Sequence, residues 1–133
     1  MKYNLQDIIK RYDEGELLKY VFFWGHHTKP GQVTKACFSQ WYPCTFEVDG
    51  IPYNCAEQYM MAGKARAFND EETLGKILSV SDPKIIKALG REVKNFDTDK
   101  WAAVSKDIVV NPHCSYSLRK SLIFSRRFFL RRF

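Results

Sequence analysis

The stretch that decides the fold runs from Tyr53 to Ala65 and reads YNCAEQYMMAGKA. From Ala56 onward its apolar side chains recur at helical spacing on most faces, so we expect a helix inside a domain. This helix carries Glu57 near its start and Lys64 two turns later, on one side. Burying an ionised carboxylate is costly unless it is paired, and burial raises its pKa toward the range useful for proton transfer.

Two roles are open for this glutamate. Asn54 is a good N-cap, and a Glu three residues later completes a pattern similar to a capping box, in which Glu57 only satisfies a backbone amide. Alternatively, the carboxylate is catalytic, because an N-terminal turn can fix a partly buried acid. The two roles are compatible.

Length and composition indicate one globular domain. The chain has 133 residues, of which 45% are hydrophobic and 15% aromatic, enough to form a core. No apolar run reaches membrane-spanning length, and the N-terminus lacks a signal-peptide pattern. The four cysteines form no CxxC pair, and the three histidines do not combine with them at zinc-site spacing. We therefore expect a cytoplasmic protein with reduced thiols, no metal site and no membrane segment.

The net charge of +6 comes from the end of the chain. After Asp107 there is no acidic residue, and the last segment carries six cations at positions 119, 120, 126, 127, 131 and 132. We interpret residues 112–133 as a basic aromatic tail. Such a tail is typical of a contact with nucleic acid or an anionic membrane surface. The alternative, which we favour, is a truncated or non-native continuation.

The pattern along the chain predicts a mainly helical α+β domain with a small antiparallel hairpin. The hairpin is predicted over residues 46–53, with an Asp49-Gly50 turn. The apolar run 21–24 predicts a buried strand closed by Gly25. Further helices are predicted over 4–13, from about 70 to 78, from Pro83 to just before Gly90, and from 98 to about 110, where Asn111-Pro112 breaks the last one.

Several motifs together resemble the NADAR (YbiA-like) domain over roughly residues 17–110, and we place this domain within residues 1–111. The motifs are Phe22-Phe23-Trp24-Gly25-His26, Ser39-Gln40-Trp41-Tyr42, Phe46 with Asp49-Gly50, Tyr53, Ala56-Glu57-Gln58-Tyr59-Met60-Met61-Ala62 with Lys64-Ala65, and Ala88-Leu89-Gly90-Arg91 followed by Trp101. The resemblance implies an α+β, mainly helical fold.

The resemblance also implies an N-glycosidase that hydrolyses the bond between a base-like nitrogen and (phospho)ribose, without a cofactor. Expected substrates are phosphoribosylamino-pyrimidine intermediates of riboflavin biosynthesis, and the alternative is an ADP-ribosyl-base hydrolase. The expected partner is a small N-riboside or an ADP-ribose-type ligand. Nucleic acid is expected as a partner only if it carries an ADP-ribosylated base that serves as substrate, or if it binds to the basic tail.

The family's catalytic glutamate falls on Glu57 and its site tryptophan on Trp101. Lys64 or Arg91 is assigned to a substrate phosphate, and the remaining predicted substrate-binding residues are Trp24, Gly25 and Tyr53. From the pattern alone, Trp101 is more simply a core anchor, and Arg91 a charge that suits a helix C-terminus.

Members of the family continue with an acidic residue and a Trp-Gly pair that are absent from this sequence. We therefore keep a second hypothesis, a non-catalytic nucleotide- or ADP-ribose-binding module or an inactive truncated copy.

Overall fold

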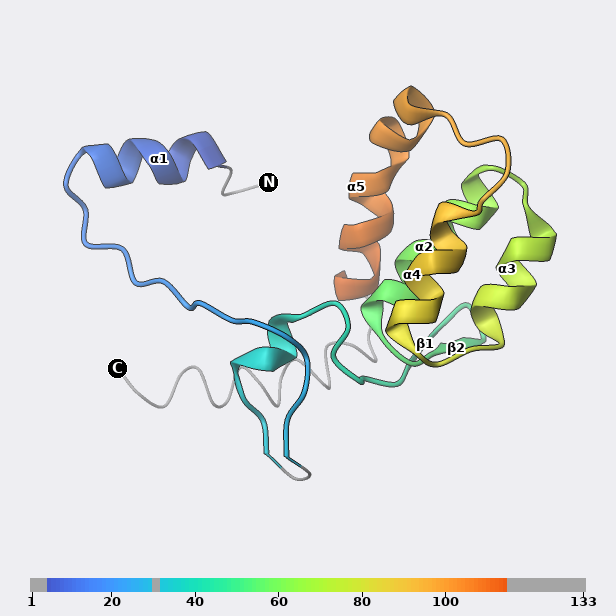
Figure 1. Cartoon of the computed structure of the whole chain (residues 1–133). Coiled ribbons are helices and arrows are strands. Elements are labelled where there is room, and N and C mark those ends of the chain that lie inside the picture. Colours follow the sequence, from blue (N-terminus) through green and yellow to red (C-terminus); the bar gives the residue numbers. More distant parts are fainter. Residues whose placement is uncertain (1–4, 30–31, 115–133) are drawn as a thin grey trace.

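A computed structural model of the chain describes residues 5–29 and 32–114, with side chains as far as residue 110. In these residues the fold is mainly helical with a small antiparallel sheet, as predicted (Figure 1). Its elements are α1 Leu5–Asp13, the 3-10 helix η1 Lys35–Phe38, β1 Phe46–Val48, β2 Ile51–Tyr53, α2 Ala56–Ala67, α3 Glu71–Leu78, α4 Pro83–Arg91 and α5 Thr98–Cys114.

The predicted hairpin is confirmed. Phe46 pairs with Tyr53 and Val48 with Ile51, which leaves the Asp49-Gly50 turn between the strands. Both turn residues have positive φ, 52° and 76°, as the two central residues of a type I′ turn require. The side chains of the first pair are buried and stacked, with 5.5 Å between ring centroids.

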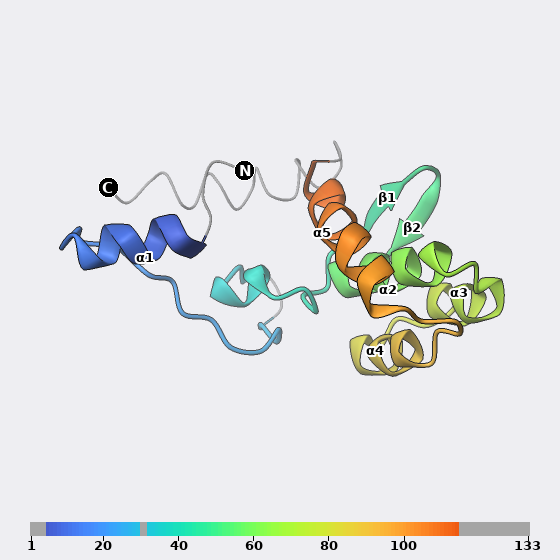
Figure 2. The same cartoon turned by 90° about the horizontal axis from the view of Figure 1, so that it is seen from above.

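Helix α2 lies at the centre of the folded body. It packs against α3, α4 and α5, and the hairpin lies beside its first turn (Figures 1 and 2). The buried core is built from α2 and the faces turned toward it, with Phe46, Tyr53, Cys55, Met61, Ala62, Ala65, Phe68, Leu74, Ile77, Ile86 and Val93. The central helix predicted from the sequence is therefore confirmed.

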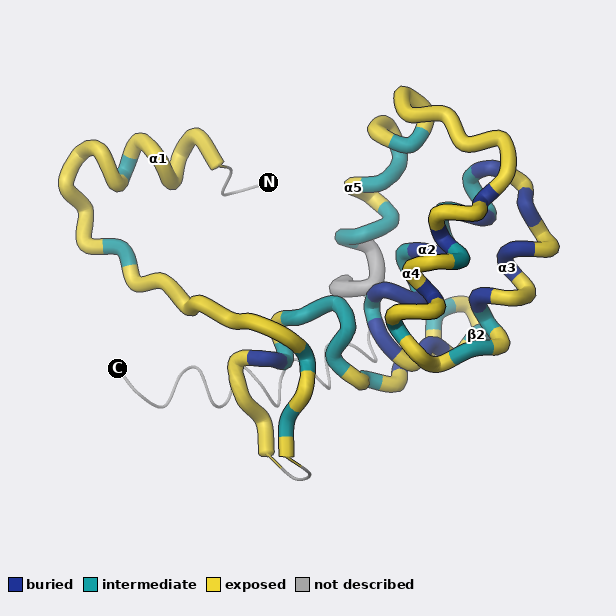
Figure 3. Tube along the Cα trace, viewed as in Figure 1, coloured by how far each residue is buried: buried dark blue, intermediate teal, exposed yellow. Residues whose placement is uncertain are grey.

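The segment before the helical body differs from prediction. No strand forms over residues 21–24; Trp24 is 98% exposed, and Phe22 is exposed as well. The prediction of a buried strand is wrong because an apolar run becomes a strand only when a neighbour pairs with it, and the described residues provide none. Helix α1 likewise has no buried residue and lies apart from the body (Figure 3).

Two predicted helix ends are also wrong. Gly90 lies inside α4, which continues to Arg91. Helix α5 does not stop at Asn111-Pro112 but continues to Cys114. A proline only disfavours a helical residue before it and removes one backbone donor, so it does not always end a helix. The predicted tail lies outside the described residues from 115 onward, and the domain boundary at 111 stays a prediction.

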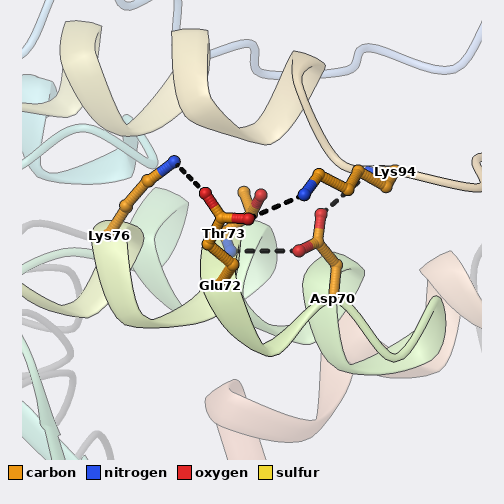
Figure 4. A network of polar contacts seen from close by, with 5 residues as sticks. All are labelled: Asp70, Glu72, Thr73, Lys76 and Lys94. Atoms are coloured by element: carbon orange, nitrogen blue, oxygen red, sulfur yellow. Dashed lines mark hydrogen bonds and ion pairs between the residues drawn. The ribbon is translucent and has the colours of Figure 1, made fainter.

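The start of α3 is fixed by a buried carboxylate (Figure 4). Asp70 accepts one hydrogen bond from the Thr73 amide (3.1 Å) and one from the Lys94 amide (2.8 Å). These amides, that of Lys94 first, lower the pKa of Asp70 to about 2. Beside it, Glu72 binds the ammonium groups of Lys76 and Lys94 at 2.6 and 2.7 Å. Asp70 thus caps α3 and ties it to the segment after α4.

Asp70→Asn should destabilise the domain at pH 6 but not at the lowest pH. A carboxyl whose pKa is lowered from its ordinary value of 3.8 to about 2 stabilises the fold above pH 3.8, and this contribution disappears as the pH falls through 2. The urea midpoints of wild type and variant should therefore differ at pH 6 and converge toward pH 2. Asp99→Asn, on the exposed first turn of α5, serves as control. A gap that is the same at both pH values would contradict this linkage.

Gly90 allows α4 to pack closely on α2. A Cβ added there would lie 2.0 Å from Sδ and 2.8 Å from Cγ of buried Met61. Gly90→Ala should therefore cost about 1–3 kcal/mol of unfolding free energy through overpacking.

Gly75→Ala is the matched control in a helix, since nothing lies within 4 Å of its added Cβ. Alanine should there increase the unfolding free energy by roughly 0.5–1 kcal/mol. Urea denaturation measures both variants, and equal effects at the two positions would refute the packing argument.

Candidate active site

The carboxylate of Glu57 is buried in the first turn of α2, with 3% of the residue exposed. Its backbone amide donates to the carbonyl oxygen of Gln40 at 3.0 Å, which holds the turn against the preceding loop. Burial raises the pKa of Glu57, while the positive charge of Lys87 and a hydrogen bond from the Trp41 indole act in the opposite direction. Because burial is the largest of these effects, this acid holds its proton more tightly than an ordinary glutamate.

Glu57 does not cap its helix. The N-cap residue is Cys55, whose side chain makes no capping hydrogen bond. The side chain that reaches back is that of Gln58, whose Oε1 accepts from the Asn54 amide at 2.7 Å. The capping-box interpretation of Glu57 is therefore wrong, because the cap lies one residue later than predicted and the next side chain serves it. The Glu57 carboxylate is not used for this structural role.

Trp41 and Lys87 complete the surroundings of the carboxylate. The Lys87 ammonium lies 5.5 Å from the centre of the Trp41 ring, within the range of a cation–π contact. The His26 ring meets the same indole edge-on at 5.5 Å. The predicted site residues included neither Trp41 nor Lys87. Trp41 belongs to a family-like motif and could have been assigned, whereas no local pattern distinguishes Lys87 from Lys84.

A second cluster surrounds Lys64, further along the same side of α2. Its Nζ donates to the Gly90 carbonyl oxygen at 2.7 Å and lies 4.1 Å from the centre of the Phe96 ring. Burial lowers the pKa of this ammonium. The half-buried Trp101 lies next to it, 5.9 Å from ring centre to Nζ, and packs against the core. The structure thus brings together two of the predicted site residues, Lys64 and Trp101.

The remaining predicted residues are scattered. Trp24 and Gly25 are exposed in the segment before η1. Arg91 is exposed in the last turn of α4. Tyr53 is 1% exposed, and its hydroxyl accepts from Nη2 of Arg66 at 2.9 Å. None of these four residues is among the groups that shift the pKa of Glu57.

Tyr53 lines an open groove of about 580 Å³ between the hairpin, α2 and α5. Its walls are Val48, Asp49, Ile51, Tyr53, Tyr59, Gly63, Arg66, Ala67, Val104 and Ile108. At about 100° per residue, Tyr59, Gly63 and Arg66 in this wall point more than a quarter-turn away from both Glu57 and Lys64. The groove and the buried carboxylate therefore lie on different faces of α2.

Neither a metal cluster nor a membrane helix stands out in the described part. Residues 5–29 and 32–114 contain no group of three or more His, Cys, Asp or Glu side chains placed to hold a metal. In the same residues, no helix combines the length and apolar character needed to cross a bilayer. Within the described residues, Cys37, Cys44 and Cys55 form no disulfide bond.

The fold and the site define a small α+β domain whose central helix holds a buried carboxylate beside a tryptophan and a lysine. The sequence pattern of the NADAR domain matches residues 22–115. The chain belongs to the NADAR domain family. It is also similar to a protein named N-glycosidase R617 from Acanthamoeba polyphaga mimivirus, with 43% identity over 96 residues. That match covers 68% of this chain and 55% of the relative, so the chain spans about half of the relative's length.

Proposed function

We propose that this chain is an N-glycosidase that hydrolyses the bond between a base-like nitrogen and a (phospho)ribose. The observation that carries the proposal is the buried Glu57 carboxylate with its raised pKa, next to Trp41 and Lys87. Membership of the NADAR family and the name of the mimiviral relative support the same chemistry.

The proposed reaction breaks the C1–N bond of the riboside, and water adds to C1. Positive charge develops on the sugar as the bond lengthens, as in glycoside hydrolysis generally. A buried glutamate can serve in two ways: protonated, it donates to the leaving nitrogen, and ionised, it stabilises the sugar cation or takes a proton from water. Trp101 is assigned to stacking on the base, and its place beside Lys64 supports a joint role in substrate binding.

As substrates we propose phosphoribosylamino-pyrimidine intermediates of riboflavin biosynthesis, with ADP-ribosylated bases as the alternative. Incubating the full chain with one substrate of each class and measuring the free base and the released sugar tests this choice. Release of both products in equal amounts is expected for one class. If neither class yields products under any condition in which the chain is folded, the N-glycosidase proposal fails.

The second candidate is a module that binds a nucleotide or ADP-ribose without hydrolysis. The observation that favours it is the cluster of Lys64 with Phe96 and Trp101, which offers a cation and aromatic rings to a nucleotide. Calorimetric titration with ADP-ribose and with ribose 5-phosphate, combined with the product assay, separates the candidates. Binding without product supports the module.

A further inference from the structure

We propose that Lys87 binds the anionic group of the substrate and makes the site specific for phosphorylated ribosides. The proposal rests on the function proposed above, and it assigns a residue that lies outside the sequence motifs quoted above. Helix α4 carries Lys87, whose ammonium lies 5.5 Å from the centre of the Trp41 ring.

Three groups of different chemistry lie next to one another at this place. The indole of Trp41 hydrogen-bonds to the Glu57 carboxylate, and the same indole lies under the Lys87 ammonium. A substrate that brings its C1–N bond to Glu57 therefore comes near a cation. An aromatic ring lies between them and offers a surface on which a sugar or base can rest.

The ammonium of Lys87 is available for a ligand. Among the described residues, no carboxylate lies within 4.0 Å of its Nζ, and the side chain is exposed. By contrast, the Lys64 ammonium already donates one hydrogen bond to the Gly90 carbonyl oxygen and lies against Phe96. Of the two, Lys87 has the free donors that phosphate needs.

The helix around Lys87 is positive along one side. Lys84, Lys87 and Arg91 follow one another at helical spacing, and α4 contains no acidic residue. Among the three, only Lys87 has a contact that ties it to the carboxylate, through Trp41.

Anion binding at Lys87 also fits the acid role of Glu57. The positive charge of Lys87 lowers the pKa of Glu57, against the larger effect of burial. A phosphate that pairs with the ammonium offsets this charge, so the carboxyl group retains its proton more firmly once substrate is bound. The groups around Glu57 that take part are Lys87 on α4, Trp41 on the preceding loop, and the Cys55 thiol beside the start of α2.

The test compares Lys87→Gln, Lys87→Arg and the control Lys84→Gln on two substrates. These are a phosphoribosylamino-pyrimidine and the riboside that lacks its phosphate. Lys87→Gln should raise KM for the phosphorylated substrate about 10- to 100-fold, the range of a lost hydrogen bond to a charged group. KM for the dephosphorylated riboside should stay nearly constant, and Lys87→Arg should restore most of the loss because it keeps the charge.

Lys84 lies one turn away on the same side of α4. Lys84→Gln should change KM by less than about threefold, as expected for an exposed charge. A Lys87→Gln effect of equal size on both substrates would overturn the proposal, since loss of structure does not discriminate between them. If Lys64→Gln or Arg91→Gln loses the preference for the phosphorylated substrate while Lys87→Gln retains it, the phosphate binds to that other residue and not to Lys87.

Direct binding separates this proposal from the catalytic one. Calorimetry on the full chain and on its Glu57→Gln variant measures the binding of ribose 5-phosphate and of ribose, two ligands that cannot be turned over. Binding of ribose 5-phosphate that is lost in Lys87→Gln supports the anion site even if no glycosidase activity is found. Turnover could instead depend on Glu57 and be equal for the phosphorylated and dephosphorylated substrates. That result would support the N-glycosidase proposal and refute the anion site.

Discussion

Glu57→Gln should reduce the rate of ribose release by about 100-fold or more, the usual contribution of a general acid or base. Glutamine keeps the size of the side chain and can still accept a hydrogen bond from the Trp41 indole, but it can neither donate a carboxyl proton nor carry a negative charge. The loss should appear in kcat with a smaller change in KM, because the interaction strengthens in the transition state. Release of free base and sugar under saturating substrate measures it.

The same substitution should leave the domain at least as stable at neutral pH. Burial raises the pKa of Glu57, so the folded state binds this proton more tightly than the unfolded state, and ionisation of the group destabilises the fold. Stability from this group is fully present below the ordinary glutamate pKa of 4.5 and decreases as the pH rises through the raised value. Thermal denaturation should show a higher Tm for the glutamine variant at pH 7 and a smaller difference near pH 4. An unfolded variant would instead show that Glu57 is structural.

The elements that the sequence predicted well are those whose signals are local. The Asp49-Gly50 turn requires positive φ at both residues, and Asp70 and Asp82 cap α3 and α4 with their own side chains. The run 21–24 was mispredicted because a strand depends on a partner elsewhere in the chain. Local patterns therefore predicted the helices and the hairpin, whereas they could not predict whether strands pair between distant segments of the chain.

The site was predicted in part for the same reason. Glu57 could be singled out because a carboxylate in an apolar helix is unusual in itself. Its neighbours Trp41 and Lys87 come from separate segments on either side of α2 in the chain. Trp41 and Lys87 come close to Glu57 only because α4 and the loop before the hairpin pack on α2. Residue spacing along the sequence does not predict this packing.

Gln58 illustrates the same limit and leads to the largest expected loss of stability. Its side chain is 0% exposed and binds two segments at once. Oε1 accepts from the Asn54 amide, and Nε2 donates to the carbonyl oxygens of Ile77 and Val80 at 3.0 and 2.8 Å. This amide therefore joins the start of α2 to the end of α3 and the connection to α4.

Gln58→Ala should lower the free energy of unfolding by about 3–5 kcal/mol, because it leaves buried backbone groups without partners and opens a cavity. Urea denaturation should show an earlier midpoint with an unchanged m-value, as expected when the two-state transition is retained. The control Gln32→Ala removes an exposed glutamine side chain and should change stability by less than about 0.5 kcal/mol. A loss at Gln58 as small as that of the control would mean that water replaces the side chain amide, and that the junction of α2 with α3 does not depend on Gln58.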